Sequence, residues 1–207
     1  MSQNVTITGS NSNIYASQVG YLFSPMRFRY RALNQKYNDI YINGVQMNDM
    51  ETGQFRYSIV GGLNQQTRGV ENSLPFEDNN FSMSGMAGSN NYNFRPSAFA
   101  TGHRFTLSGA NRNYTLRGMY TYNSGVKENG WAYSANLTYR WANMNTSYVE
   151  GTFYNALSYF FGAEKFINDQ HHISLVTWGN PTERASQGAA TDEMYWLANN
   201  RFYNPNW

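Results

Sequence analysis

The sequence contains no cysteine. Disulfides, thiol catalysis and cysteine-based metal sites are therefore excluded. Charged residues are also scarce, at 14%, against roughly 25% in ordinary soluble domains. The formal net charge is only +2, and no block of Lys or Arg occurs, so nucleic acid is not an expected partner.

Long hydrophobic runs are absent as well. No stretch reaches the roughly 18 apolar residues that a membrane-spanning helix requires, and the mean hydropathy is −0.64. Any membrane crossing would therefore have to use β-strands. Residues 1–14 are polar and lack the basic start and apolar stretch of a secretory signal. We therefore expect an export signal to lie upstream of Met1 and the chain to be truncated at its beginning.

Aromatic and small polar residues are abundant instead. Aromatics make up 17% of the 207 residues, with 17 tyrosines, and Asn, Ser, Thr and Gly fill much of the rest. This mixture is typical of strands that face lipid on one side and a wet lumen on the other, with Tyr at the two interfaces. So many aromatic residues argue against a disordered chain.

The first part of the chain carries short strand signals. Residues 26–32 alternate between apolar and cationic side chains, as a strand with two different faces would. The cationic face consists of Arg27, Arg29 and Arg31. Residues 39–45 are β-branched and aromatic, and their Asn43-Gly44 pair predicts a tight hairpin.

A less regular region follows. Two glycines interrupt residues 58–64, and residues 67–80 are predicted to be irregular because they hold Pro75 and a small acidic group. We place a domain boundary near Asn90 to Pro96. The predicted domains are residues 1–96 and residues 97–207.

Beyond this boundary the sequence predicts long alternating strands separated by turns of unequal length, as in an antiparallel barrel wall. The strands are expected at residues 103–109, 113–123, 131–141, 152–166 and 172–178. From Asn180 onward we expect an outer loop, with Thr191 as the N-cap of a short helix over residues 192–197.

The segment from Trp131 to Trp141 has the clearest pattern. Its even-numbered positions are small or polar, whereas its odd-numbered positions are apolar, with aromatic residues gathered near both ends. The odd-numbered side chains are Trp131, Tyr133, Ala135, Leu137, Tyr139 and Trp141. A lipid-facing strand between two aromatic girdles is expected to look like this.

At this point the residues resemble a known family. Residues 26–31, the segment 39–53 with its Asn43-Gly44 turn, and Gly61-Gly62-Leu63-Asn64 resemble the plug domain of TonB-dependent receptors from Bacteroidetes. The similarity continues through barrel segments and covers nearly the whole chain. These further segments are Trp131, Glu150-Gly151-Thr152, Asn180-Pro181-Thr182-Glu183-Arg184 and Tyr203-Asn204-Pro205-Asn206-Trp207.

The resemblance implies an all-β fold: the C-terminal part of a plug in residues 1–96, then the first strands and an outer loop of a transmembrane β-barrel in residues 97–207. The TonB box and the first half of the plug would lie before Met1, and most of the roughly 22 barrel strands after Trp207.

The implied function is uptake of a nutrient, such as a glycan, peptide or metal chelate, across the bacterial outer membrane by ligand binding and plug gating. The expected partners are TonB, outer-membrane lipid and a small-molecule, glycan or peptide ligand, and the sequence leaves open whether a surface lipoprotein also takes part. No enzyme activity, cofactor or metal is expected.

Candidate site residues fall into two groups. Arg27, Arg29 and Arg31 would pair with carboxylates of the barrel wall, unless they form the solvated face of a plug strand. A sugar or peptide ligand would stack on aromatic rings, unless these rings pack the loop itself. The rings are Tyr195, Trp196, Tyr203 and Trp207.

Other patterns predict ordinary structure. Adjacent His171 and His172 would point to opposite faces of a strand and could not easily bind one metal. A glycosidase pair would have to come from acidic residues in turns, where carboxylates are common. These residues are Asp39, Asp49, Glu51, Glu77 and Asp78. The Gly-rich residues 84–89 lack the Lys of a phosphate loop and predict a turn.

Two other classes of protein remain open. A secreted or surface β-sandwich that binds carbohydrate would have similar Tyr, Trp and Asn content. A soluble fragment of the receptor would have to cover its aromatic rows by packing or by oligomerising. The two aromatic girdles of residues 131–141 favour the barrel.

Overall fold

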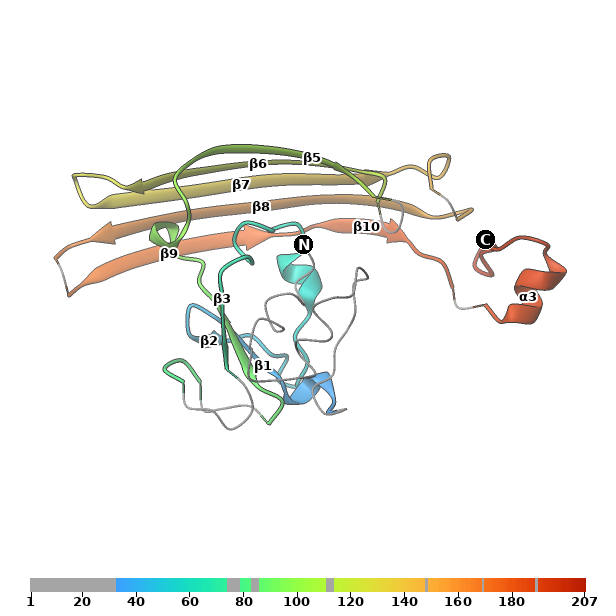
Figure 1. The fold of residues 1–207 in the computed structure, drawn as a ribbon, viewed down its shortest axis with the longest axis horizontal. Helices are drawn as coiled ribbons and strands as arrows, with labels where there is room; N and C mark the ends of the chain where they lie inside the picture. The colour runs from blue at the N-terminus through green and yellow to red at the C-terminus, as the bar shows by residue number, and fades with distance from the viewer. Residues whose placement is uncertain are drawn as a thin grey trace, which may run out of the picture. The chain divides into compact units, whose positions relative to one another are not determined.

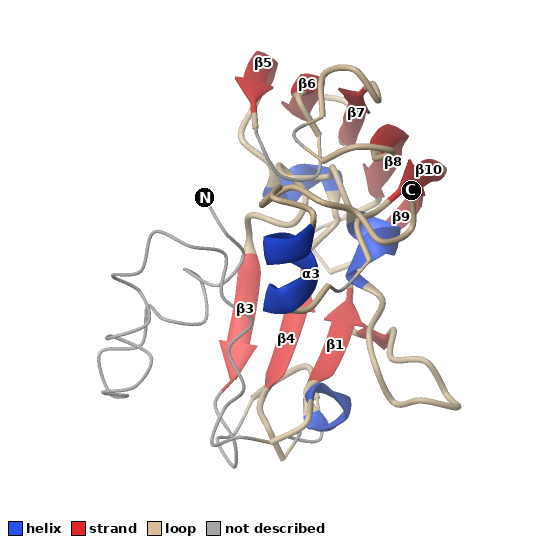
Figure 2. Cartoon of the chain, turned by 90° about the vertical axis from the view of Figure 1, so that its right-hand side faces the viewer, coloured by secondary structure: helices blue, strands red, loops and turns tan. Residues whose placement is uncertain are grey.

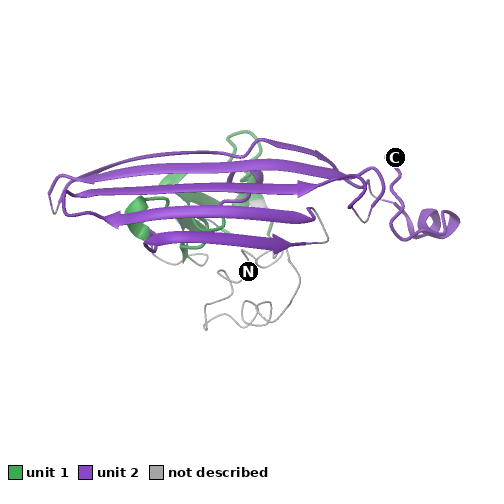
Figure 3. Cartoon of the chain, turned by 90° about the horizontal axis from the view of Figure 1, so that it is seen from above, with its two compact units in different colours: residues 1–57, 64–98 green, residues 58–63, 99–207 purple. Residues whose placement is uncertain are grey.

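The computed structural model describes residues 33–73, 79–82, 86–110, 114–147, 149–168, 170–188 and 190–207. The fold is all-β with predominantly antiparallel pairing, which confirms the predicted fold class. Among the described residues, no helix has the length and apolar character needed to cross a membrane. The chain divides into two compact units (Figure 3): unit 1 is Met1–Tyr57 with Asn64–Ala98, and unit 2 is Ser58–Leu63 with Phe99–Trp207.

Unit 1 contains a four-stranded sheet in the order β2-β1-β4-β3. Its strands are β1 (Asp39–Ile42), β2 (Val45–Gln46), β3 (Val70–Ser73) and β4 (Ser89–Tyr92). Strands β1 and β2 form the predicted hairpin around Asn43-Gly44, whose φ angles of 51° and 80° are those of a tight primed turn. Figure 2 shows β3, β4 and β1 side by side.

Two of these strands lie where no strand was predicted. Strand β3 lies within the region expected to be irregular, and β4 overlaps the expected boundary. All four residues of β4 are buried although three are Ser or Asn. Their amides have partners: Asn90 Nδ2 donates to Asn38 Oδ1 at 3.1 Å and Asn91 Nδ2 to Glu71 Oε2 at 3.0 Å. Because β4 pairs in parallel with the distant β1, local sequence alternation could not reveal it.

Apolar side chains form the buried core of unit 1. Ile40 and Ile42 of β1 are buried, as are Phe55, Tyr92 and Phe94. The described residues also contain three short 3₁₀ helices: η2 (Gln35–Tyr37), η3 (Tyr57–Val60) and η4 (Pro96–Ala98).

Unit 2 contains a six-stranded antiparallel sheet in the order β10-β8-β7-β6-β5, with β9 also paired to β8 (Figure 1). The strands are β5 (Gly102–Gly109), β6 (Leu116–Val126), β7 (Trp131–Ala142), β8 (Phe153–Phe166), β9 (His172–Gly179) and β10 (Thr182–Ala185). The five long strands predicted from the sequence are confirmed, with small shifts at their ends.

Strand β10 is the difference from the prediction, since an outer loop was expected from Asn180 onward. Strands β9 and β10 both pair with β8, one after the other along its length. Pro181 separates them because it has no N–H to donate to the ladder, although its carbonyl still accepts from Leu157 N at 3.2 Å. The predicted helix is confirmed as α3 (Asp192–Leu197), with Thr191 as the N-cap that accepts from Met194 N.

The two faces of the unit 2 sheet are inverted relative to an ordinary soluble sheet. On β6, β7 and β8 the buried face carries many polar side chains beside apolar ones such as Met119, Ala156 and Phe160, and we call it the polar face. Its buried polar residues are Thr121, Asn123, Ser134, Asn136, Thr138, Ser158 and Glu164. The opposite side is the apolar face, and its exposed side chains include Phe105, Leu107, Leu116, Leu137, Tyr139, Leu157, Tyr159, Phe161, Ile173 and Leu175.

Candidate functional site

A ladder of side-chain hydrogen bonds runs across the polar face. Ser134 Oγ donates to Asn123 Oδ1 at 2.5 Å, and Asn136 Nδ2 donates to Thr121 Oγ1 at 2.7 Å. Thr138 Oγ1 lies 3.0 Å from Asn136 Oδ1. Buried polar groups are costly unless they have such partners. The hydrogen bonds of the ladder therefore allow these polar side chains to be buried.

The glycine loop, residues Ser58–Leu63, is seated on the polar face within unit 2. Thr138 Oγ1 lies 2.9 Å from Gly62 O and can donate its proton there. Gly62 has a φ of 83°, and a Cβ atom at this position would collide with the Ser158 side chain. Only glycine therefore allows both the backbone conformation and the close approach.

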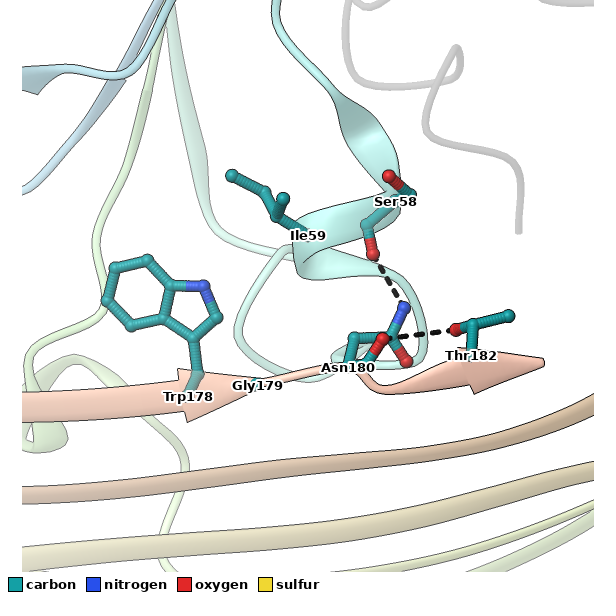
Figure 4. A pocket seen from close by; sticks show the side chains of 6 residues that line it. All are labelled: Ser58, Ile59, Trp178, Gly179, Asn180 and Thr182. Carbon is teal, nitrogen blue, oxygen red and sulfur yellow. Dashed lines mark hydrogen bonds between the residues drawn. The ribbon is translucent and has the colours of Figure 1, made fainter.

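Asn180 connects the glycine loop to the strands. Its Oδ1 accepts from Arg140 Nη2 at 2.9 Å and from Ser158 Oγ at 2.5 Å. Its Nδ2 donates to Ser58 O at 2.5 Å (Figure 4). Since Asn180 stands in the break between β9 and β10, its side chain is available for this role. The loop and Asn180 are far apart in the sequence, and no local pattern links them.

An open hollow of about 370 Å³ lies beside this network. Its lining residues are Ser58, Ile59, Trp178, Gly179, Asn180 and Thr182. In Figure 4, Ile59 and Trp178 supply apolar surface, while the amide of Asn180 and the hydroxyl of Thr182 supply hydrogen-bonding groups. A ring beside neutral polar groups suits an uncharged polar ligand held by stacking and hydrogen bonds.

The apolar face carries rows of large side chains across the strands. One row runs in register from Phe105 through Tyr120 and Leu137 to Tyr159. The Tyr159 ring lies over Gly179 of β9, where an added Cβ would meet it. Phe105 is 80% exposed and Leu175 is 68% exposed. Exposed apolar surface of this extent marks an interaction site on a soluble protein.

Lysines accompany the aromatic residues at one end of β7. Trp131 and Tyr133 are stacked, with ring centroids 5.6 Å apart. Lys165 Nζ lies 5.3 Å from the Trp131 centroid, and Lys127 Nζ lies 5.3 Å from the Tyr133 centroid. Such rings and long cationic side chains are typical of the boundary between an apolar medium and water.

The four predicted stacking residues are divided by the structure. Gln187 Nε2 joins two of them, since it donates to Tyr195 Oη at 3.2 Å and to Tyr203 O at 2.8 Å. The ring of Trp207 packs against Gly151, whereas Trp196 on α3 is 79% exposed. The structure therefore brings Tyr195 and Tyr203 together and leaves Trp196 exposed to solution. Ligand stacking stays a prediction for all four.

Asn204 holds this C-terminal segment against the connection between β7 and β8. Its Nδ2 donates to Glu150 O at 2.9 Å, and its Oδ1 accepts from Gly188 N at 3.1 Å. Asn204 is buried for this reason. Two of the segments that carry the family resemblance, residues 150–152 and 203–207, are thus in contact.

The remaining predicted residues that the structure describes are not gathered into a metal site. Arg27, Arg29 and Arg31 lie outside the described residues, as do Glu77 and Asp78. Within the part of the chain that the structure describes, no three His, Asp or Glu residues gather to bind a metal. His172 Nε2 is 3.9 Å from Glu164 Oε1, a loose contact across β8 and β9.

The described carboxylates of unit 1 serve its turns. Asp49 Oδ1 accepts from Thr52 N at 2.8 Å and from Glu51 N at 3.1 Å. These hydrogen bonds, led by that from Thr52, hold the pKa of Asp49 below its usual value. Burial instead raises the pKa of Asp39, although the hydrogen bond from Gln46 opposes this shift.

Comparison with known proteins supplies no relative. No protein-family model matches the chain, and no curated protein or solved structure matches it either.

Proposed function

We propose that this chain is part of a TonB-dependent outer-membrane transporter of the Bacteroidetes type. In this proposal the strands of unit 2 belong to the wall of a β-barrel, and residues 1–96, the glycine loop included, belong to the plug. The single observation that carries the proposal is the inversion of the unit 2 sheet, which buries Thr, Ser and Asn side chains and exposes Leu, Phe and Tyr. Lipid is the medium in which that arrangement is favourable.

Strand length supports the same proposal. Strand β7 has 12 residues and β8 has 14. At roughly 3.3 Å per residue and a tilt of about 40°, twelve residues span about 30 Å across a membrane. This matches the hydrocarbon thickness of a typical bilayer, which is about 30 Å. The lysines near Trp131 and Tyr133 would then lie at one interface.

The contacts of the glycine loop suit a plug that moves. Neutral hydrogen bonds from Thr138 and Asn180 hold its backbone, and each such bond contributes only about 0.5–1.5 kcal/mol. A pull transmitted from TonB could break them one after another, without the cost of separating buried ion pairs. The solute would be a glycan, peptide or metal chelate, delivered with or without a surface lipoprotein.

The direct test uses the absence of cysteine from the chain. Ser174 and Leu175 are neighbours on β9, and both are exposed, but they point to opposite faces of the sheet. The variants Ser174→Cys and Leu175→Cys would each be labelled with a fluorophore and refolded into lipid vesicles. Lipids brominated in their acyl chains should quench the label at position 175 and leave the label at position 174 bright.

Equal quenching at both positions would contradict the proposal. A second measurement is size exclusion with light scattering and circular dichroism, performed with and without detergent. Folding only in detergent or lipid supports the barrel wall. A monomer that is soluble without detergent and melts cooperatively would replace it with a secreted β-sandwich that binds carbohydrate.

A further inference from the structure

Two arginines lie opposite each other on the polar face. Arg117 of β6 is the register partner of Arg140 of β7. Their guanidinium groups are always charged, and like charges directly opposite on a sheet are destabilising. The neighbouring register pairs on this face are neutral, such as Thr121 with Asn136. The pair therefore calls for an explanation other than stability.

No acidic side chain of the described residues neutralises this pair. Neither Arg117 nor Arg140 has a carboxylate within 4 Å in the part of the chain that the structure describes. Glu164 is the acidic residue on the polar face of β5–β10, and it lies at the opposite end of β8 from Ala156, the register partner of Arg140. The two register partners thus carry two positive charges without a counter-charge among the described residues.

Aromatic rings and hydrogen bonds hold both guanidinium groups in place. Arg117 Cζ lies 5.9 Å from the Tyr114 ring centroid, and Arg140 Cζ lies 5.3 Å from that of Tyr154. The two rings are neighbours, with centroids 6.3 Å apart. Arg117 Nε also donates to Ser108 Oγ at 2.9 Å. Fixed guanidinium groups lose little freedom when they bind a ligand.

Each guanidinium keeps donors for a further acceptor. Arg117 donates hydrogen bonds through Nε, and Arg140 donates them through Nη2. A guanidinium group has five N–H groups in all. Within the described chain, the two terminal nitrogens of Arg117 and Nη1 of Arg140 have no hydrogen-bond partner. Both residues are partly exposed. Paired donors of this kind match the two oxygens of a carboxylate or a phosphate.

We propose that Arg117 and Arg140 form a binding site for an oxyanion group, a carboxylate or a phosphate, of a small solute. The inference rests on the proposed function in one respect, namely that the polar face lines an aqueous lumen. It adds a substrate class, because an acidic solute would be held on the wall by charge-assisted hydrogen bonds. The neutral hollow near Trp178 would not distinguish an acidic solute from an uncharged one.

The test is isothermal titration calorimetry of the full chain, folded in detergent, with D-glucuronate and with inorganic phosphate. D-glucose serves as the uncharged counterpart of glucuronate. We expect at least one of the two anions to bind and glucose not to bind. Arg117→Gln and Arg140→Gln should each weaken anion binding by about tenfold or more. Lys165→Gln removes the same charge from the opposite face of the sheet, at the register partner of Trp131, and should leave binding unchanged.

The two titrations identify the chemical group that the site binds. Binding of glucuronate alone indicates a carboxylate site, and binding of both glucuronate and phosphate indicates a general oxyanion site. Absence of binding by the folded chain overturns the inference, as does unchanged binding by both arginine variants. Arg117→Gln leaves the contact between Arg140 and Asn180 intact, so it tests the site even if Arg140→Gln fails to fold. A chain that binds glucuronate but shows no lipid-facing residue at position 175 would keep this site and lose the transporter proposal.

Discussion

Strand β1 of unit 1 and strand β7 of unit 2 bury opposite kinds of side chain. In unit 1, β1 buries Ile40 and Ile42 beside Phe55 and Phe94, as expected of a domain folded in water. In unit 2, β7 buries Ser134, Asn136 and Thr138. Burial alternates along most of β7, whereas β1 buries three consecutive residues. In unit 2 the alternation therefore identifies a strand but not the medium that each face requires.

The difference has an energetic consequence. Burial of apolar side chains stabilises unit 1 in water by roughly 25 cal/mol per Å². The unit 2 sheet leaves its apolar face open, so in water it is held by hydrogen bonds and by the small apolar cluster of Ala142, Tyr154 and Ala156. Its stability should therefore depend on the medium, while that of unit 1 should not.

The five tryptophans allow the two units to be observed separately. All of them follow residue 130 and belong to unit 2. Tryptophan fluorescence therefore reports on unit 2, and hydrogen exchange of peptides that cover β1 and β4 reports on unit 1.

The largest effect is expected from a cavity in unit 1. Ile40 is 1% exposed, and Ile40→Ala should destabilise unit 1 by about 2–5 kcal/mol. Faster exchange of the β1 and β4 amides would measure this loss, with and without detergent. If the loss vanished in detergent, the two units would not differ in their dependence on the medium.

A charged side chain introduced on the apolar face of unit 2 should lower the stability of the unit. Leu137 lies mid-strand and is 52% exposed, so Leu137→Lys should cost about 2–4 kcal/mol when the chain is folded in vesicles. The tryptophan-monitored urea midpoint measures the cost. Val45→Lys is the matched control, because Val45 is 62% exposed on unit 1. Hydrogen exchange of peptides that cover β1 should show a change in stability of no more than about 0.5 kcal/mol. Similar small effects at both positions would mean that both faces meet water.

Substitution of two glycines tests how closely the glycine loop approaches Ser158 on the polar face. Gly44 and Gly62 have similar φ angles, 80° and 83°, but a Cβ at Gly44 would meet nothing within 4 Å. Gly44→Ala should cost only the conformational strain, about 1–2 kcal/mol. Gly62→Ala must also displace Ser158 and should lose about 1–3 kcal/mol more. Urea unfolding gives the comparison, followed by hydrogen exchange of β1 peptides for Gly44→Ala and by tryptophan fluorescence for Gly62→Ala. Equal losses would show that the glycine loop is not held tightly.

Local pattern explains what the sequence predicted well. The strands of unit 2 were predicted because residues 131–141 and 152–166 alternate over long stretches. Helix α3 was predicted because Thr191 is a suitable N-cap residue. Strand β4 was missed because its Ser, Asn and Tyr residues show no apolar alternation and its partner β1 lies far back in the chain. The network of Asn180 with Ser58 and Arg140 could not be predicted, since only the fold brings these residues together.

The smallest effect should appear at high pH and only in unit 1. Burial, reinforced by the nearby Tyr57, raises the pKa of Tyr92 well above its usual value of 10.0. Because the folded state favours the protonated phenol, its contribution is complete below the unfolded pKa and is lost as pH rises beyond about 10 toward the folded value. Amide exchange of β4 peptides in unfolding titrations between pH 8 and pH 11 should show stability falling above pH 10. Tyr92→Phe should reduce that fall and leave the tryptophan signal of unit 2 unaffected. An equally steep fall in the variant would mean that Tyr57 and Tyr41, whose pKa values are also raised by burial, account for the alkaline sensitivity of unit 1.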